Sequence, residues 1–231
     1  MENISKRDKK IYAIISVFIV ILIFITFLVS SNELFQAYVN DKVLTNGWNE
    51  DGKGYYESRL LGLEKQASFN YINDNKTYPA SLTVSSFKTL FMISEKELIE
   101  KTIQTIESNM KKMNIFIDKD SEKQGQRVLN NRHRTNYVVF NASKMINDTN
   151  EKIKIIGEAW NCEKSGSSII TIGFAQTTNK SVYFPEEIYV EDFSHFAKII
   201  KDPGNTFGFY LDSPEYVFLG DDGLIFNIIC H

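Results

Sequence analysis

The chain has 231 residues, of which 43% are hydrophobic and 24% charged, and its formal net charge is −3 at pH 7. Seventeen Phe and eleven Tyr supply enough apolar surface for a packed core, which excludes a disordered stalk. After residue 30 the chain carries 22 basic and 27 acidic side chains, a balance that argues against a nucleic-acid partner.

Residues 11–30 form an apolar run without a charge, a proline or a glycine. As a helix this run would be ~30 Å long, which matches the hydrocarbon core of a bilayer. Four basic residues precede it, whereas Lys42 is the only base among residues 31–45. The positive-inside rule therefore predicts a cytoplasmic N-terminus at 1–10, a single transmembrane helix at 11–30 and the remainder outside the cell. A cleaved signal peptide is the alternative.

Residues 31–59 are predicted to contain a juxtamembrane helix and then a linker rich in glycine and asparagine. The helix would occupy 32–44, where apolar side chains recur on one side. We expect the extracytoplasmic domain itself to cover residues 60–231.

Within that domain, Ser94 to Glu97 form a capping box that predicts the start of a helix. Apolar side chains at helical spacing extend this long helix to Met113. Segments rich in β-branched and aromatic residues predict strands before and after it. These are residues 67–72, 82–93, 137–140 and a hairpin over 152–175.

Three further segments are interpreted from local pattern alone. Residues 118–135 resemble a polar, basic loop, residues 191–200 a short helix, and residues 216–230 a closing hairpin with its turn at Gly220 to Gly223. The whole order predicts an α+β fold with one mostly antiparallel sheet and helices on one face.

The two cysteines, Cys162 and Cys230, both follow the predicted anchor, and in an oxidising compartment they would pair as a disulfide. Free thiols, a metal site or a catalytic role are the alternatives. A zinc site would draw on both cysteines with His231 and His195, but these ligands come from distant segments without the usual close pairing. We therefore expect no metal and no cofactor.

Four sequons follow the predicted anchor and permit N-glycosylation outside the cell. Their asparagines are Asn75, Asn141, Asn147 and Asn179.

A possible ligand site combines two stretches of the chain. One is the basic loop that contains Arg132 and Arg134, and the other is the segment that contains Glu158, Trp160 and Asn161. Guanidinium groups bind phosphate, sulfate or carboxylate, so an anionic ligand or an acidic protein partner would suit the basic loop. If the two segments converge, they would line an anion-binding cleft; otherwise, Arg132 or Arg134 would pair with Glu158. The candidate residues are Arg132, His133, Arg134, Glu158, Trp160 and Asn161.

Common catalytic motifs are absent from the sequence, which disfavours an enzyme. We expect a membrane-anchored domain that binds a ligand or partner at the cell surface. One alternative is a thiol or hydrolytic enzyme that uses Cys162 with a histidine. Another is a structural subunit of a membrane complex.

Three stretches, together with the anchor, resemble archaeal single-pass membrane proteins with an extracytoplasmic domain and no assigned function. They are residues 133–135, 157–162 and 222–225. The element order also resembles the PsbP-type extrinsic subunit fold, which implies an α/β/α sandwich used for binding rather than catalysis.

Overall fold

The computed structural model describes residues 14–23, 33–44, 47–60, 63–73, 80–146, 148–176, 181–183, 189–193, 197–202, 216–219 and 223–231. Residues 14–23 are helical and fall inside the predicted transmembrane segment. Both ends of that segment, and the predicted cytoplasmic residues 1–10, lie outside the described residues. Over the part of the chain that is described, no helix has the length and apolar character needed to cross a membrane.

The domain is built on an eight-stranded antiparallel sheet, which confirms the predicted α+β class with a mostly antiparallel sheet. Its strand order is β2-β4-β5-β9-β8-β7-β6, with β3 also paired to β4. The strands are β2 (Trp48–Glu50), β3 (Tyr55–Arg59), β4 (Glu64–Asn73), β5 (Ala80–Lys88), β6 (Phe116–Val128), β7 (Arg134–Ile146), β8 (Thr149–Cys162) and β9 (Ser167–Gln176).

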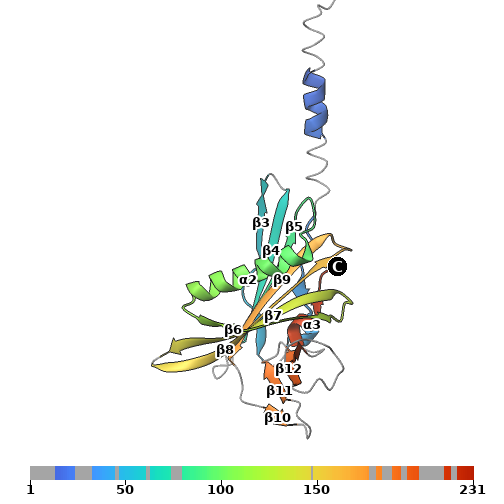
Figure 1. The fold of residues 1–231 in the computed structure, drawn as a ribbon. Coiled ribbons are helices and arrows are strands. Elements are labelled where there is room, and N and C mark those ends of the chain that lie inside the picture. The colour runs from blue at the N-terminus through green and yellow to red at the C-terminus, as the bar shows by residue number, and fades with distance from the viewer. Residues whose placement is uncertain are drawn as a thin grey trace, which may run out of the picture.

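Helix α2 (Glu95–Lys112) lies across one face of this sheet (Figure 1). The Ser94 hydroxyl accepts a hydrogen bond from the Glu97 amide, so the predicted helix start at Ser94 and the long helix are confirmed. Leu98, Ile106 and Met110 are buried against the sheet. The helix approaches β8 closely at Gly157, where an added Cβ would lie 2.6 Å from the Thr102 methyl group.

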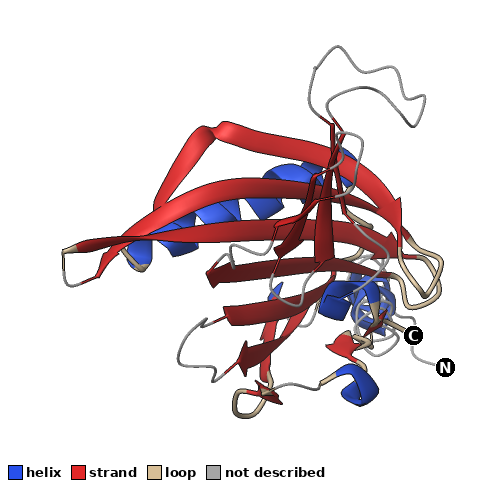
Figure 2. Ribbon diagram, turned by 90° about the horizontal axis from the view of Figure 1, so that it is seen from below, coloured by secondary structure: helices blue, strands red, loops and turns tan. Residues whose placement is uncertain are grey.

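The opposite face of the sheet is covered by both ends of the domain. Strand β1 (Tyr38–Val39) pairs with β14 (Ile228–Ile229), and the short helix α3 (Gly223–Phe226) precedes β14. Together with the sheet they enclose a second core around Trp160, Leu82 and Ile225. Figure 2 shows the long strands of the sheet curving past the long helix α2, with the C-terminus to one side of the sheet.

A second, smaller sheet joins four strands from the C-terminal third of the chain. They are β10 (Ser181–Tyr183), β11 (Tyr189–Phe193), β12 (Ala197–Asp202) and β13 (Tyr216–Leu219). The helix predicted at residues 191–200 is therefore wrong, because most of this segment belongs to β11 and β12.

Three other local expectations are corrected by the structure. The described part of the predicted juxtamembrane helix holds β1 and a 3₁₀ turn, η1 (Asp41–Val43). The predicted basic loop at 118–135 is mostly strand β6, an edge strand stabilised by its pairing with β7. The second strand of the predicted closing hairpin is α3 followed by the two residues of β14.

Candidate metal centre

Four sulfur and nitrogen donors converge where the C-terminus meets the main sheet. His133, Cys162, Cys230 and His231 each offer one donor atom, and these atoms all lie within 4.8 Å of one another. We call this group the thiol–histidine cluster. Both cysteines are buried, His133 is half-buried and His231 is exposed, so the cluster lies at the domain surface with its sulfurs inward.

Cys162 is the last residue of β8 and begins the tight turn to β9. The Gly166 amide donates to the Cys162 carbonyl at 2.8 Å, and Gly166 takes a left-handed φ of 63° that a glycine adopts without strain. The Cys162 side chain lies on the same face of β8 as Trp160, because alternate residues of a strand share a face. The sheet thus holds this sulfur in a defined position.

His133 is held by the turn between β6 and β7. Arg132 in that turn adopts a left-handed φ of 67°, and its amide donates to the Leu129 carbonyl at 2.8 Å. The Asn131 side-chain amide donates to the Ile228 carbonyl at 2.9 Å and contacts the Cys230 sulfur at 3.6 Å. The turn and the C-terminal segment are therefore packed together, which brings His133 to the two cysteines.

Cys230 and His231 follow β14 directly. The Cys162 and Cys230 side chains lie 3.2 Å apart. His231 Nδ1 lies 3.5 Å from the sulfur of Cys162 and 3.7 Å from that of Cys230. The two histidine rings meet edge to face, with centroids 5.4 Å apart. Cys230 and His231 are adjacent in sequence, and both reach the cluster because the described strand β14, in which neighbours alternate between faces, ends at residue 229.

The predicted disulfide is not formed in the structure. Cys162 and Cys230 are free thiols, and their separation of 3.2 Å exceeds the S–S bond of about 2.05 Å. The sequence therefore predicted the right pair of neighbours, which the structure shows in the reduced form.

The two thiols share their protons unequally. The hydrogen bond from Cys230, with further hydrogen bonds from Ser165 and His231, lowers the pKa of Cys162 to about 4. The same hydrogen bond to Cys162, together with burial, raises the pKa of Cys230. The shared hydrogen bond thus favours the thiolate form of Cys162 over that of Cys230, and a thiolate is the form that binds metals or attacks electrophiles.

One polar atom of the cluster has no partner. His133 Nε2 is buried and makes no hydrogen bond to the described residues. A buried imidazole nitrogen left in this way costs on the order of 1–3 kcal/mol, unless something else occupies the position. Two thiols and two imidazoles that face one point are the donor set that Zn²⁺ takes in tetrahedral sites.

Glu158 lies four residues before Cys162 on strand β8. It takes part in a separate buried cluster. Arg127 on β6 donates from Nε to Glu158 Oε1 at 2.9 Å and from Nη2 to Oε2 at 2.7 Å. The Thr135 hydroxyl donates to the same carboxylate. The expected partner of Glu158, Arg132 or Arg134, is therefore replaced by Arg127, whose side chain is 4% exposed.

The other predicted ligand residues do not form one cleft. Arg132 and Arg134 are exposed, whereas Trp160 is 1% exposed within the core. The Asn161 amide donates to the Ile93 carbonyl at 2.9 Å and accepts from Ser168, so it holds β8 to the chain before α2. Of the six predicted residues, His133 alone reaches the thiol–histidine cluster.

Of the four sequon asparagines and His195, the described part of the chain includes Asn141 alone. Asn141 is exposed on β7. Asn75, Asn147, Asn179 and His195 lie outside the described residues.

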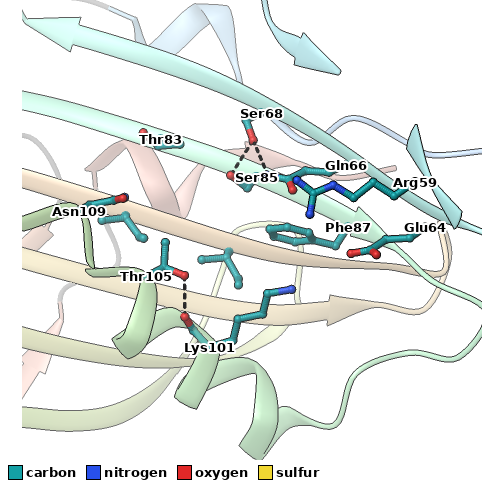
Figure 3. A pocket seen from close by; sticks show the side chains of 12 residues that line it. Arg59, Glu64, Gln66, Ser68, Thr83, Ser85, Phe87, Lys101, Thr105 and Asn109 are labelled. Carbon is teal, nitrogen blue, oxygen red and sulfur yellow. Dashed lines mark hydrogen bonds between the residues drawn. The ribbon is translucent and has the colours of Figure 1, made fainter. Parts of the chain in front are cut away.

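A polar cleft of about 380 Å³ opens between α2 and strands β3 to β5 (Figure 3). Lys101, Thr105 and Asn109 face it from one side of α2 at intervals of four residues. Hydroxyl and amide side chains of β4 and β5 line the opposite wall, where Ser68 and Ser85 share a hydrogen bond of 2.8 Å. Lys101 Nζ lies 4.5 Å from the centre of the Phe87 ring. None of the residues predicted to bind a ligand lines this cleft.

The composition of the thiol–histidine cluster could have been partly inferred from the sequence. The pair Cys230 and His231 and the lone Cys162 were recognised as possible zinc ligands, but His195 was considered in place of His133. An Asn-Asn pair just before Arg132 is a turn signal, and a hairpin there would have carried His133 toward the sheet edge. Its proximity to the C-terminal residues has no local signal.

No family model matches the chain, no curated protein matches its sequence, and no solved structure matches its fold.

Proposed function

We propose that this chain is a membrane-anchored extracytoplasmic domain that binds a thiophilic divalent metal ion, for which zinc is the best chemical fit. The observation that carries the proposal is the convergence of two thiols and two imidazoles within 4.8 Å. Tetrahedral zinc, with bonds of about 2.3 Å to sulfur and 2.0 Å to nitrogen, needs donors roughly 3.3–3.8 Å apart. Small side-chain movements therefore complete the coordination sphere.

The chemistry of the donors selects the kind of metal. Thiolate sulfur is a soft ligand that disfavours Mg²⁺ and Ca²⁺, whereas thiolate combined with imidazole suits Zn²⁺. Four protein donors also fill a tetrahedral sphere and leave no position for a substrate, which is typical of structural zinc rather than catalytic zinc. Asn131, which contacts the Cys230 sulfur at 3.6 Å, supplies the outer-shell hydrogen bond that such sites use.

The ion would join three segments that are distant in sequence: the β6–β7 turn, the end of β8 and the C-terminal residues after β14. Because β14 pairs with β1, the metal would also fix the position of the first described strand after the predicted anchor. Binding energy of this kind appears as folding energy, so the metal would stabilise the whole C-terminal side of the domain.

The membrane part of the proposal rests on the apolar run at 11–30 and on the basic residues before it. Protease protection in intact cells tests it directly. We expect external protease to cleave the domain. Protection of the domain in intact cells, with cleavage only after lysis, would contradict the proposed topology.

The metal part is tested on the reduced full-length chain in detergent. We expect elemental analysis to find about one zinc ion per chain, as a single tetrahedral site requires. Replacement by Co²⁺ should produce thiolate-to-cobalt charge-transfer bands and tetrahedral d–d bands. Reduced protein that takes up neither ion would overturn the proposal.

Three variants make that measurement specific. Cys162→Ser and His133→Ala should each weaken metal binding and change the cobalt spectrum. His195→Ala is the matched control, because it removes the remaining histidine of the chain, and it should leave the spectrum unchanged. Loss of the cobalt bands in His195→Ala with retention in His133→Ala would show that His195, and not His133, is the metal ligand.

A thiol enzyme is a second candidate, because Cys162 lies 3.5 Å from His231 Nδ1 and has a lowered pKa. It predicts rapid alkylation of Cys162 by iodoacetamide, slowed about tenfold or more in His231→Ala. Both cysteine residues are, however, no more than 1% exposed, which disfavours access by a substrate larger than a small molecule. Zinc that fully protects Cys162 from alkylation would support the metal centre.

A further inference from the structure

We propose that Cys162 and Cys230 form a reversible disulfide and that its formation releases the metal ion. This inference rests on the proposed metal-binding function and adds its regulation. The thiol–histidine cluster would then have two closed states, one with metal and reduced sulfurs and one with a disulfide and no metal.

The spacing of the sulfurs supports both states. The cysteine side chains lie 3.2 Å apart. Two thiolates on one tetrahedral zinc ion are about 3.7 Å apart, and the sulfurs of a disulfide are about 2.05 Å apart. The observed separation lies between these values, so either state needs a movement of only about 1 Å.

The backbone on the two sides of the pair differs in a way that permits this movement. Cys162 ends a long strand that is paired on both sides, with β7 and β9. Cys230 follows β14, which makes only two residue pairs, with β1. We therefore expect the C-terminal segment to supply most of the displacement, while the end of β8 stays in place.

The chemistry balances with a two-electron oxidant of the peroxide class. One thiolate attacks a peroxide oxygen, which gives a sulfenic acid and releases hydroxide. The second thiolate attacks the sulfenic sulfur, forms the S–S bond and releases a second hydroxide. The two sulfurs lose two electrons and hydrogen peroxide gains them, whereas the zinc ion keeps its charge. It leaves because two of its four ligands have lost their negative charge.

The disulfide would keep the segments joined after the metal has left. Both linkages connect the end of β8 to the C-terminal segment, 68 residues further along the chain. Oxidation should therefore change the metal content of the domain without detaching α3 and β14. His231, exposed and within 3.7 Å of both sulfurs, marks the route by which a small oxidant reaches them.

The test starts from the reduced, zinc-loaded, full-length chain in detergent. Hydrogen peroxide is added stepwise, released zinc is measured with a chromogenic chelator, and the 162–230 crosslink is measured by peptide mass spectrometry. We expect about one zinc ion released for each crosslink formed, with a mass loss of about two hydrogens per chain, and recovery of zinc binding after a dithiol reductant is added. That stoichiometry would support the switch.

Variants separate the switch from the metal site. His133→Ala combined with His231→Ala should weaken zinc binding yet still form the crosslink, whereas Cys162→Ser should form none. If the reduced wild-type chain binds zinc but oxidises to sulfinic acid or to intermolecular dimers, the switch is overturned and the metal site stands. If the reduced chain binds no zinc, both proposals fail.

Discussion

Two clusters of polar groups lie on one face of β8. They differ in whether the chain itself supplies a hydrogen-bond partner for every buried group. Glu158 receives hydrogen bonds from Nε and Nη2 of Arg127 and one from Thr135, so its charge is matched within the domain. Four residues later, the thiol–histidine cluster leaves His133 Nε2 without a partner among the described residues. The comparison teaches that the Glu158 cluster is complete within the chain, whereas two thiols and two imidazoles with an unpartnered His133 Nε2 leave a place for an ion.

The largest expected effect on the free energy of unfolding concerns Glu158, whose partners are all supplied by the chain. Glu158→Gln leaves the Arg127 guanidinium buried without a counter-charge, and we expect a loss of about 3–5 kcal/mol in the free energy of unfolding. Urea denaturation of the reduced, zinc-loaded protein measures it. The double variant Arg127→Met, Glu158→Leu is the control and should recover most of that loss. A loss below about 1 kcal/mol in Glu158→Gln would show that the pair is not desolvated.

Removal of the proposed metal ion tests the thiol–histidine cluster. A ligand present at about 100 times its dissociation constant stabilises the folded state by about 2.7 kcal/mol. We therefore expect a strong chelator to lower the melting temperature of the reduced protein. Cys162→Ser should start lower and respond little to the chelator. An equal response in the variant would place the chelated metal elsewhere.

Tyr71 offers a second satisfied group for comparison, with a pH readout. Its hydroxyl accepts a hydrogen bond from the Val39 amide at 3.0 Å, and burial raises the pKa of Tyr71 to about 12. As the pH rises past 10, the unfolded chain loses this phenolic proton before the folded chain does. The associated stability is complete below about pH 10 and falls by up to about 2–3 kcal/mol as the pH approaches 12.

Thermal unfolding between pH 9 and pH 12 measures this change. Tyr71→Phe should be less stable at pH 9, because the Val39 amide loses its acceptor, and its stability should fall less steeply above pH 10. Parallel pH curves for the two proteins would contradict the assignment.

The smallest expected effect concerns the surroundings of His231. Lys164 Nζ lies 3.2 Å from His231 Nε2. If Nδ1 binds zinc, Nε2 carries a proton and needs an acceptor, which an ammonium group cannot supply. Lys164→Gln offers an amide oxygen and should raise zinc affinity by up to about tenfold, as outer-shell hydrogen bonds do. Lys164→Met, which has no acceptor, should raise it less in a competitive chelator titration.

Local signals in the sequence predicted the parts of the fold that local interactions determine. The Ser94 cap and the apolar stripe behind it define α2 correctly, and residues 152–175 form the expected hairpin of β8 and β9. Strand β6 was missed because it is a polar edge strand, with a composition that also suits a loop. Its conformation comes from pairing with β7, which a window of sequence does not show.

Residues 191–200 show the opposite error. Their apolar residues recur at a spacing that suits a helix, but the chain reverses between β11 and β12, and each strand is paired with neighbours on either side. Tertiary pairing outweighs helical propensity in such short segments. The helix was therefore inferred from a pattern that two paired strands also satisfy.

The site was predictable in its two sulfurs and in His231, but not in His133. Two cysteines in a domain expected outside the cytoplasm are natural neighbours, and Cys162 and Cys230 do lie together. His133 joins them because the β6–β7 turn packs against the chain after α3, through contacts that include Asn130 to Phe226 and Asn131 to Ile228. Contacts across almost 100 residues leave no trace in local sequence pattern.

The pairing of β1 with β14 has a mechanical consequence. Tyr38 opposite Ile229 and Val39 opposite Ile228 join the first described strand after the predicted anchor to the strand that ends just before Cys230. The Ala37 amide also donates to the Ser86 hydroxyl of β5 at 2.8 Å, so a pull on the chain at residue 37 would load the main sheet and the β1–β14 pairs together. If residues 11–30 are fixed in a bilayer, tension between membrane and domain would therefore reach the metal ligands through β14 as well as reaching the main sheet.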